Sequence, residues 1–414
     1  MYKGDTIQRP PGGFLRDLLA YRSLCGIARA ILVIGVKRMI YLDNAATTAV
    51  SDAAKNAVNM GLEVFGNPSS LHGVGLEAEK LLRAAREKLA AALGVKDKEV
   101  FFTSCATESS NTVIFGTAQA HGRRRNRIIT TTVEHPSVAE PVNELEKRGF
   151  DVVRVSPDDN GKITPEMIAQ NVDANTLLVS CMHVNNETGY ILPVERIFKA
   201  VKRKNPDTIC HCDCVQSFMK LKFKAKDLGA DCISVSGHKL HAPKGVGALY
   251  VKSGVRLLPL VYGGGQEGGF RSGTENIPYI NAFAASTAEL EPTIMKRYET
   301  VSILKERLVN NLSGKEEISI NSGDDCSPYV ISVSVGRIKS ETMLHYLESR
   351  GIYVSSGSAC SKGRKSGVLS QFRIPDKYLD STVRVSLCAD NTAEDIDAFC
   401  QALLDGQKTL AKIR

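Results

Sequence analysis

Short apolar runs rich in β-branched residues alternate with helix-like stretches from residue 39 onward, and this alternation limits the possible folds more than any other feature. The strand-like runs lie at 100–103, 127–130, 152–155, 177–180, 208–211 and 232–235. The helix-like stretches lie at 76–93, 108–120, 138–148, 165–170 and 194–204. Strands that are apolar almost throughout are typical of a mostly parallel sheet covered on both faces. The sequence therefore predicts an α/β fold that binds its ligand at the carboxyl ends of the strands.

The pattern changes near residue 290, which indicates a second and smaller domain. A polar helix candidate at 290–312 precedes an alternating strand at 330–335, a helix candidate at 341–350, a Ser/Gly loop, a strand at 382–387 and a final helix from 392. We predict a large domain at 50–288 and a small α+β domain made of 39–49 and 289–414.

Charge and cysteine content bound the compartment and the partners. The formal net charge is +8, and most of the excess lies in residues 1–38. The remaining body is close to neutral, so net charge gives no reason to expect direct nucleic-acid binding. The 11 cysteines are odd in number and lie mostly in apolar surroundings. They indicate free thiols in a reducing cytoplasm rather than a disulfide framework.

The N-terminal segment 1–38 is predicted to be a poorly ordered extension. Its apolar run at 30–36 is too short to span a bilayer, and basic residues bracket it. No small-residue cleavage site follows, so a signal peptide is not indicated. A clean strand-like pattern begins at Met39, which leaves open whether Met39 is the native start.

The segment Ser236–Lys239 directly follows the strand-like run at 232–235. A lysine at the end of a buried strand suits an enzyme that works through a Schiff base, because partial desolvation keeps the amine neutral often enough to attack a carbonyl. Ser236 and His238 could hold a phosphate. Taken alone, the four residues favour an ordinary solvated strand end, and only the other motifs reverse that reading.

Two further segments follow predicted strands. Residues 102–111 indicate a strand end, a turn and a helix start capped by Thr107 or a neighbour, with Glu108 in the first turn. The free N–H groups of such a start can cradle a phosphate, although a plain capped helix fits equally well. His135 could stack on a ring or pass a proton, although a lone histidine is more often structural.

The segment Cys210–Ser217 resembles a metal-binding run, but a metal site is not predicted there. On one strand its three cysteines point to one face, whereas His211 and Asp213 point to the other, so they cannot close around one ion. A carboxylate at a strand end can instead pair with a protonated pyridine nitrogen, which suits Asp213. Gln216 can reach the same ring.

Two loops have a structural and a functional interpretation. Asn185 and Asn186 precede a Thr-Gly pair and are typical turn formers, but one of them could bind a cofactor oxygen. The glycine-rich loop 263–274 allows a close backbone approach to a ligand, and a flexible connector is equally compatible.

The loop 355–365 places Cys360 among small residues, with three cations just after it. An exposed, electropositive setting favours the thiolate, so Cys360 is the candidate reactive thiol. Arg384 lies among β-branched residues on the next predicted strand. Such an arginine needs an anionic partner, and a substrate carboxylate is the natural choice.

In combination and in this order, these motifs resemble the cysteine desulfurases, which are fold-type I pyridoxal-phosphate (PLP) enzymes of the class V aminotransferase group. The resemblance covers residues 39–405. It implies a seven-stranded, mostly parallel sheet, a homodimer, and removal of sulfur from L-cysteine to give L-alanine and a persulfide on Cys360. The sulfur would pass to an acceptor protein of iron–sulfur cluster assembly or of tRNA or cofactor thiolation. Cys360 could also transiently ligate an iron–sulfur cluster.

The resemblance also implies a role for each matching residue. Lys239 would bind the cofactor covalently and then move protons; Asp213 would pair with the pyridine nitrogen and Gln216 with the ring hydroxyl; His135 would stack on the ring and serve in proton transfer. The remaining positions would hold the phosphate (Ala106, Thr107, Ser236, His238, and Thr274 from the other subunit) or the substrate carboxylate (Asn185, Arg384).

Two positions depart from the family pattern. The family often has glycine at Cys105, where we expect a packing substitution, with a second redox-sensitive thiol as the alternative. The loop after Cys360 is unusually basic, which favours an acidic partner protein or one already bound to tRNA.

Two other functions remain open: a selenocysteine lyase or related PLP β-lyase, and a catalytically silent module that recruits partners.

Overall fold

The computed structural model describes residues 39–356 and 367–411. The chain divides into two units, Met1–Ile40 and Tyr41–Arg414, and the helices of the described residues all lie in the second. The predicted extension at 1–38 lies outside the described residues. Among the described residues, no helix combines the length and the apolar character needed to cross a membrane.

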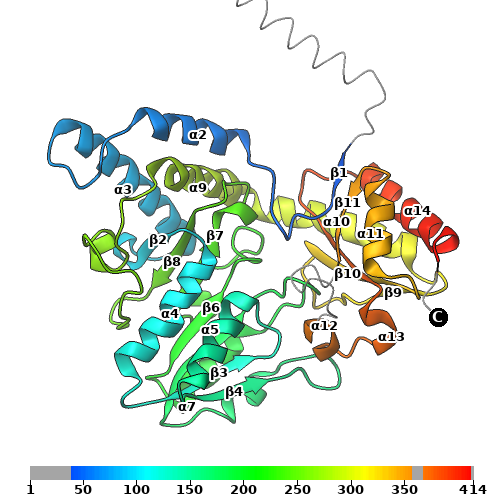
Figure 1. The fold of residues 1–414 in the computed structure, drawn as a ribbon, viewed down its shortest axis with the longest axis horizontal. Coiled ribbons are helices and arrows are strands. Elements are labelled where there is room, and N and C mark those ends of the chain that lie inside the picture. Colours follow the sequence, from blue (N-terminus) through cyan, green and yellow to red (C-terminus); the bar gives the residue numbers. More distant parts are fainter. Residues whose placement is uncertain (1–38, 357–366, 412–414) are drawn as a thin grey trace, which may run out of the picture. The chain divides into compact units, whose positions relative to one another are not determined.

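A seven-stranded sheet forms the larger part of the second unit (Figure 1). All its strands run in the same direction except β8, which is antiparallel to both of its neighbours, β2 and β7. The mostly parallel seven-stranded sheet is thereby confirmed. Its strands, in spatial order, are β2 (Val100–Thr103), β8 (Gly247–Val251), β7 (Cys232–Ser236), β6 (Ile209–Asp213), β5 (Thr176–Met182), β3 (Arg127–Thr131) and β4 (Asp151–Val155).

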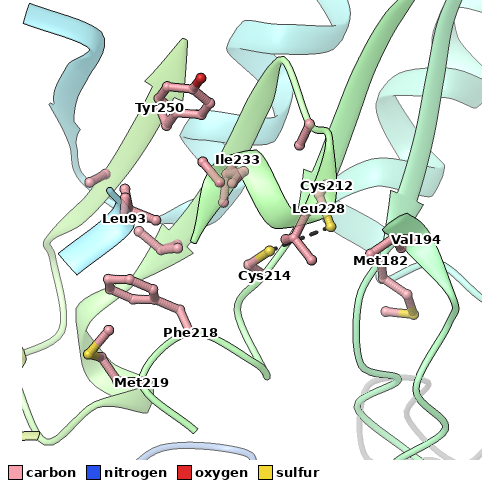
Figure 2. Packing of buried hydrophobic residues seen from close by; sticks show 14 of the residues in the cluster. Leu93, Met182, Val194, Cys212, Cys214, Phe218, Met219, Leu228, Ile233 and Tyr250 are labelled. Atoms are coloured by element: carbon pink, nitrogen blue, oxygen red, sulfur yellow. Dashed lines mark hydrogen bonds between the residues drawn. The ribbon is translucent and has the colours of Figure 1, made fainter. Parts of the chain in front are cut away.

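Two hydrophobic clusters cover the opposite faces of this sheet, because successive strand residues point to opposite sides. Ile128 packs with α4 (Ala106–His121) and α5 (Pro136–Lys147), whereas its neighbour Ile129 packs with α3 (Gly73–Leu93) and α7 (Val194–Lys204). The cysteines of β6 belong to the second cluster, part of which Figure 2 shows. Their shared face is the one predicted from the alternation along the strand.

A four-stranded antiparallel sheet lies in the C-terminal part, with three long helices around it (Figure 1). Its strands, in spatial order, are β12 (Ser355–Ser356), β13 (Thr382–Ser386), β10 (Val330–Val335) and β9 (Ile318–Ile320). The helices are α10 (Ile294–Leu312), α11 (Ser340–Glu348) and α14 (Ala393–Thr409). The other described elements are β1 (Ile40–Tyr41), α2 (Asp52–Glu63), α6 (Pro165–Ala169), α8 (Ala225–Leu228), α9 (Ile277–Leu290), β11 (Ile352–Tyr353), α12 (Gly367–Gln371) and α13 (Asp376–Leu379).

The helix predicted at 290–312 is shorter than expected. Helix α9 ends at Leu290, a 3-10 turn covers Glu291–Thr293, and α10 begins only at Ile294. Pro292 lies in this turn and has no N–H to donate, which accounts for the break. The division into domains at 50–288 and at 39–49 with 289–414 stays a prediction.

A glycine on β8 brings the start of α4 onto the sheet. A Cβ added at Gly247 would lie 2.7 Å from the carbonyl carbon of Cys105 and 2.9 Å from its Cα. Only a residue without a side chain allows this approach. The close contact places the N-terminus of α4 beside the carboxyl end of β7, where the candidate site lies.

Candidate active site

A cavity of about 420 Å³ opens at the carboxyl ends of the strands of the seven-stranded sheet, the position expected for a ligand site in such a fold. Residues far apart in the sequence meet there, and most of the predicted site residues are among them. Those that line the cavity are Ala106, Thr107, His135, Asp213, Gln216, Ser236, His238, Lys239 and Arg384.

Lys239 ends a short 3-10 helix, Gly237–Lys239, that follows β7 without a break. Its Nζ donates to the carbonyl oxygens of Ala45 at 2.6 Å and Ala46 at 2.7 Å. The two carbonyls hold the amine on the wall of the cavity. The segment Tyr41–Thr48, which provides them, is therefore part of the site.

Asp213 is the last residue of β6 and is buried. One of its carboxylate oxygens accepts a hydrogen bond from the backbone N–H of Val215 at 2.9 Å. Burial raises the pKa of Asp213, while the hydrogen bond and the charges of His135 and Lys239 oppose that rise. A buried carboxylate in this position is stabilised by a cation, and a protonated ring nitrogen would supply one.

His135 is the N-cap of α5, and its ring Nδ1 accepts the backbone N–H of Ser137 at 3.1 Å. Since Nδ1 is the acceptor, the contacts assign the proton of the neutral ring to Nε2. Burial lowers the pKa of His135, with the charge of Asp213 acting in the opposite direction. The histidine is thus held as a neutral imidazole able to give or take a proton.

The N-terminus of α4 forms another wall of the cavity, and here the predicted cap is wrong. Cys105 rather than Thr107 takes the N-cap position, and its side chain makes no capping hydrogen bond. Glu108 compensates by accepting from the backbone N–H of Ser104 at 2.9 Å. The first N–H groups of the helix are thereby left to a ligand.

Ser236 and His238 line the same cavity as this helix start. The hydroxyl of Ser236 is buried and has no hydrogen-bond partner. Burial, followed by the charge of Lys239, lowers the pKa of His238 to about 4, so the ring is neutral at neutral pH. An unpartnered hydroxyl, a neutral imidazole and a helix N-terminus together suit a phosphate.

Cys105 does not pack in the core, contrary to the expected packing substitution. Its thiol is half-buried and lines the cavity. The backbone at Cys105 is extended, with φ −174° and ψ 170°, which any residue adopts, so glycine is not required there.

Arg384 lies on β13 and reaches the cavity from the four-stranded sheet. One terminal nitrogen donates to Asp43 at 2.9 Å and the other to the carbonyl oxygen of Asn186 at 3.1 Å. Its Nε is buried and has no partner. Asp43 therefore holds the guanidinium in place, while Nε remains able to donate to an anion.

The structure does not bring Asn185 to the cavity. Its side-chain nitrogen donates to the carbonyl oxygen of Val133 at 3.0 Å, and its oxygen accepts from the backbone N–H groups of Glu187 and Thr188. The amide is fully used within the turn, and the next residue, Asn186, lines the cavity instead. This geometry counts against the predicted role of Asn185.

Thr274 is not among the residues that line this cavity. Thr274 is exposed and lines a separate cavity beside Ser104 and Arg271. Cys360 lies outside the described residues, as does the basic segment after it.

The glycine-rich loop before Thr274 is more than a free connector, because its Glu267 accepts two hydrogen bonds from Arg86 at 2.7 and 2.8 Å.

The segment Cys210–Ser217 holds no cluster of ligands around one point. His211 is buried between the hydroxyls of Ser180 at 2.8 Å and Ser234 at 2.9 Å, on the face opposite the cysteines. Within the described ranges, the one group of three potential metal ligands is His241, Cys388 and Asp390, outside the main cavity. Sequence reasoning missed that group, since the three residues are not adjacent in the chain.

Asp43, Ser137 and Asn186 also line the cavity; sequence reasoning missed the first two, and of the two adjacent asparagines it chose Asn185 rather than Asn186. Asp43 had a usable signal, because it precedes the small residues Ala45 and Ala46 at the start of the strand–helix pattern. Ser137 lies two residues after His135, the distance at which an N-cap side chain accepts a backbone N–H of the helix. For Asn186 the choice between two adjacent asparagines depends on the turn geometry alone.

The comparisons with known proteins agree with this geometry. The family model described as aminotransferase class-V matches residues 40–399. A NifS/IcsS protein homolog from Lactobacillus delbrueckii subsp. bulgaricus is 39% identical over 381 residues, which cover 91% of this chain and 99% of the relative. A cysteine desulfurase from Nostoc sp. is 39% identical over 371 residues, covering 88% of this chain and 92% of the relative.

Solved structures show the same likeness. A NifS-like protein superposes with a TM-score of 0.85 at 38% identity, over 90% of this chain and all 100% of that one. A structure described as SspA in complex with cysteine superposes with a TM-score of 0.75 at 31% identity, over 85% of this chain and 99% of that one. The fold and the matched length show that the chain belongs to the aminotransferase class-V family. Within that class, the chain belongs to the cysteine desulfurase family.

Proposed function

We propose that this enzyme is a PLP-dependent cysteine desulfurase. Its reaction converts L-cysteine and the thiol of Cys360 into L-alanine and a persulfide on Cys360. The sulfur atom moves from the substrate to the enzyme thiol, so atoms and electrons balance without a further oxidant. The observation that carries the proposal is the meeting of Lys239, Asp213, Ser236 and Arg384 around one cavity.

The residues of the cavity fit PLP at both ends of the molecule. The unpartnered hydroxyl of Ser236 and the free N–H groups at the start of α4 would hold the phosphate. The buried carboxylate of Asp213 would pair with the ring nitrogen and keep it protonated. Gln216 would donate to the ring hydroxyl, and His135 would lie on the ring.

PLP held in this cavity would supply an electron sink for the substrate. This chain's own residues position the substrate and move its protons. Arg384 would hold the substrate carboxylate through its unpartnered Nε, with Asp43 fixing the guanidinium. The neutral imidazole of His135 and the amine of Lys239 are the groups able to transfer protons on this wall.

Cys360 is the proposed nucleophile toward the substrate sulfur, on the strength of its sequence setting among small residues and cations. On either side of the segment that holds Cys360, Ser356 ends β12 and Gly367 begins α12. Ser355 of β12 lines the cavity, so the loop leaves from the wall of the site.

A homodimer is part of the proposal. Large apolar side chains are exposed along α2, α3 and the segment between them, at Met60, Leu62, Phe65, Leu71 and Leu76. Exposed apolar residues in such number mark an interaction surface. Thr274 lies outside the cavity of its own subunit and is exposed, which suits a residue that completes the phosphate site of a second copy.

The proposed acceptor of sulfur is a protein of iron–sulfur cluster assembly or of tRNA or cofactor thiolation. The basic residues after Cys360 favour a partner with an acidic surface. We place the enzyme in the cytoplasm, because the nine cysteines of the described part are all free thiols.

The test is production of alanine from L-cysteine by the purified protein supplied with PLP and a thiol reductant. Lys239→Ala should bind PLP only reversibly and form no alanine. Cys360→Ser should keep the visible colour of the bound cofactor yet lose turnover, whereas Cys326→Ser is the matched control and should retain both. Full turnover by Cys360→Ser would refute the assigned nucleophile, and faster reaction with selenocysteine independent of Cys360 would favour the lyase alternative.

A further inference from the structure

Lys220 is a buried lysine that the proposed reaction does not use. It lies in the turns after β6, seven residues past Asp213, and only 7% of its surface is exposed. The residue before it, Met219, has a positive φ of 58°, which a side chain adopts at a cost. The chain accepts a strained turn and a buried amine at the same point.

The environment of Lys220 does not explain the amine as part of an ion pair. In the part of the chain that the structure describes, no carboxylate lies within ion-pair distance of its Nζ. The charged and titratable groups that face it are Lys239, His238, His241, Arg384, Cys388 and the ring of Tyr329, whose centroid is 5.8 Å away. Burial, followed by the charge of Lys239, lowers the pKa of Lys220 to about 7.

One hydrogen bond connects Lys220 to the site. Its Nζ donates to the side-chain oxygen of Gln216 at 3.0 Å. The side-chain nitrogen of Gln216 in turn donates to the carbonyl oxygen of Ala45 at 3.0 Å, the same oxygen that accepts from Lys239. The carbonyl oxygen of Ala45 only accepts, which places the Gln216 nitrogen toward Ala45, and the Lys220 amine donates to the oxygen that then faces it; the two contacts together define one orientation of the Gln216 amide.

We propose that Lys220 is a positioning residue that fixes the Gln216 amide with its N–H groups toward the cavity. One N–H is bonded to Ala45, and the other is directed to the ligand on the cavity wall. The inference rests on the proposed binding of PLP, whose ring hydroxyl is the acceptor for that N–H. Lys220 touches neither the cofactor nor the substrate and acts through Gln216.

The fixed orientation has a measurable consequence for the cofactor. A donor beside the ring oxygen stabilises its ionised form and therefore lowers the pKa of the proton shared with the nitrogen of Lys239. Without Lys220 the Gln216 amide keeps only its hydrogen bond to Ala45, so it can rotate more easily and present its own oxygen to the cavity, which would destabilise the ionised form. Removal of Lys220 should then raise the pH at which the visible absorption of the bound cofactor changes.

The experiment compares holoenzymes in a spectrophotometric pH titration. Lys220→Met keeps the length of the side chain and removes the donor; we expect the absorption midpoint to rise by about one pH unit, the size of one lost hydrogen bond. Lys220→Arg keeps a donor and should restore most of the difference. Affinity of the apoprotein for PLP, measured by fluorescence, should fall about fivefold in Lys220→Met.

Two controls separate this role from a structural one. Lys222→Met, in the same segment but exposed, should leave the midpoint unchanged. In a Gln216→Ala background, Lys220→Met should shift the midpoint far less than it does alone, because the group it acts through is absent.

The outcomes are distinguishable. A coloured Lys220→Met holoenzyme with an unchanged midpoint would overturn this inference and leave the proposed function intact. An equal shift in the presence and absence of Gln216 would also overturn it. A wild-type protein that binds no PLP would overturn the proposed function and the inference together.

Discussion

Replacing Ser236 by alanine should change the stability of the apoprotein and its affinity for PLP in opposite directions. The Ser236 hydroxyl is buried without a hydrogen-bond partner, and an unsatisfied buried hydroxyl costs about 1–3 kcal/mol. Ser236→Ala removes that cost, so the apoprotein should be stabilised by about 1 kcal/mol. The same change deletes a donor to the cofactor phosphate. A hydrogen bond to a charged group is worth about 1.5–3 kcal/mol, so the Kd for PLP should rise roughly ten- to hundredfold.

Both quantities can be measured on one preparation from which PLP has been removed. Thermal unfolding gives the stability of the apoprotein, and fluorescence titration with PLP gives the Kd. Ser286→Ala is the matched control, because the Ser286 hydroxyl is also buried and unpartnered but lies on α9, outside the cavity. It should stabilise the apoprotein similarly and leave the Kd unchanged. If Ser236→Ala lowered the apoprotein stability, or left the Kd unchanged, the assignment of this hydroxyl to the phosphate would be refuted.

Glu267→Ala should lower the free energy of unfolding in urea by about 3–5 kcal/mol, because it leaves the mostly buried Arg86 unpaired. Asp151→Ala breaks the more exposed pair with Arg127 and should lower it by under about 1 kcal/mol. Equal losses in the two variants would contradict this reasoning. Burial lowers the pKa of His211 from 6.5 to about 3, so the unfolded state binds more protons in this window and stability is lost as the pH falls through it. His211→Asn should remove about 1.4 kcal/mol per pH unit of that loss, and an unchanged acid dependence of urea unfolding would show that the histidine is not held neutral. Asp43→Ala should raise KM for L-cysteine about tenfold with a smaller change in kcat, because the guanidinium of Arg384 loses its carboxylate partner. A fall in kcat alone in steady-state assays would argue against substrate binding by Arg384.

The arrangement of the large sheet could be predicted because its strands carry their own signal. Runs such as Leu177–Ser180 are apolar on both faces and are separated by helices of ordinary length, which is the pattern of a covered parallel sheet. Strand β8 was missed because only a 3-10 turn, Gly237–Lys239, separates it from β7, with no α-helix between them, so it breaks the alternation. Helix α9 is rich in small residues and packs against α2 and α3, which are far from it in the sequence.

The chemistry of the site could be predicted where a charged side chain would destabilise the fold unless it had a partner. Asp213 and Arg384 lie in apolar strands and Lys239 lies just after one, and a charged group in such a place needs a partner. Asn186 could not be distinguished from Asn185, because only the hydrogen bonds of the folded turn decide which amide is used up. Lys220 gave no sequence signal, since a single lysine in a turn is ordinary until burial is known.

The segment Tyr41–Thr48 is synthesised early but contacts β13, which is synthesised near the end of the chain. Asp43 contacts Arg384, and Ala45 donates its N–H to the hydroxyl of Ser386, across 341 positions of sequence in each case. A nascent chain cannot form these contacts until β13 has left the ribosome. The enzyme should therefore acquire its cofactor only after nearly all of the chain has emerged, and truncated products that end before β13 should stay colourless.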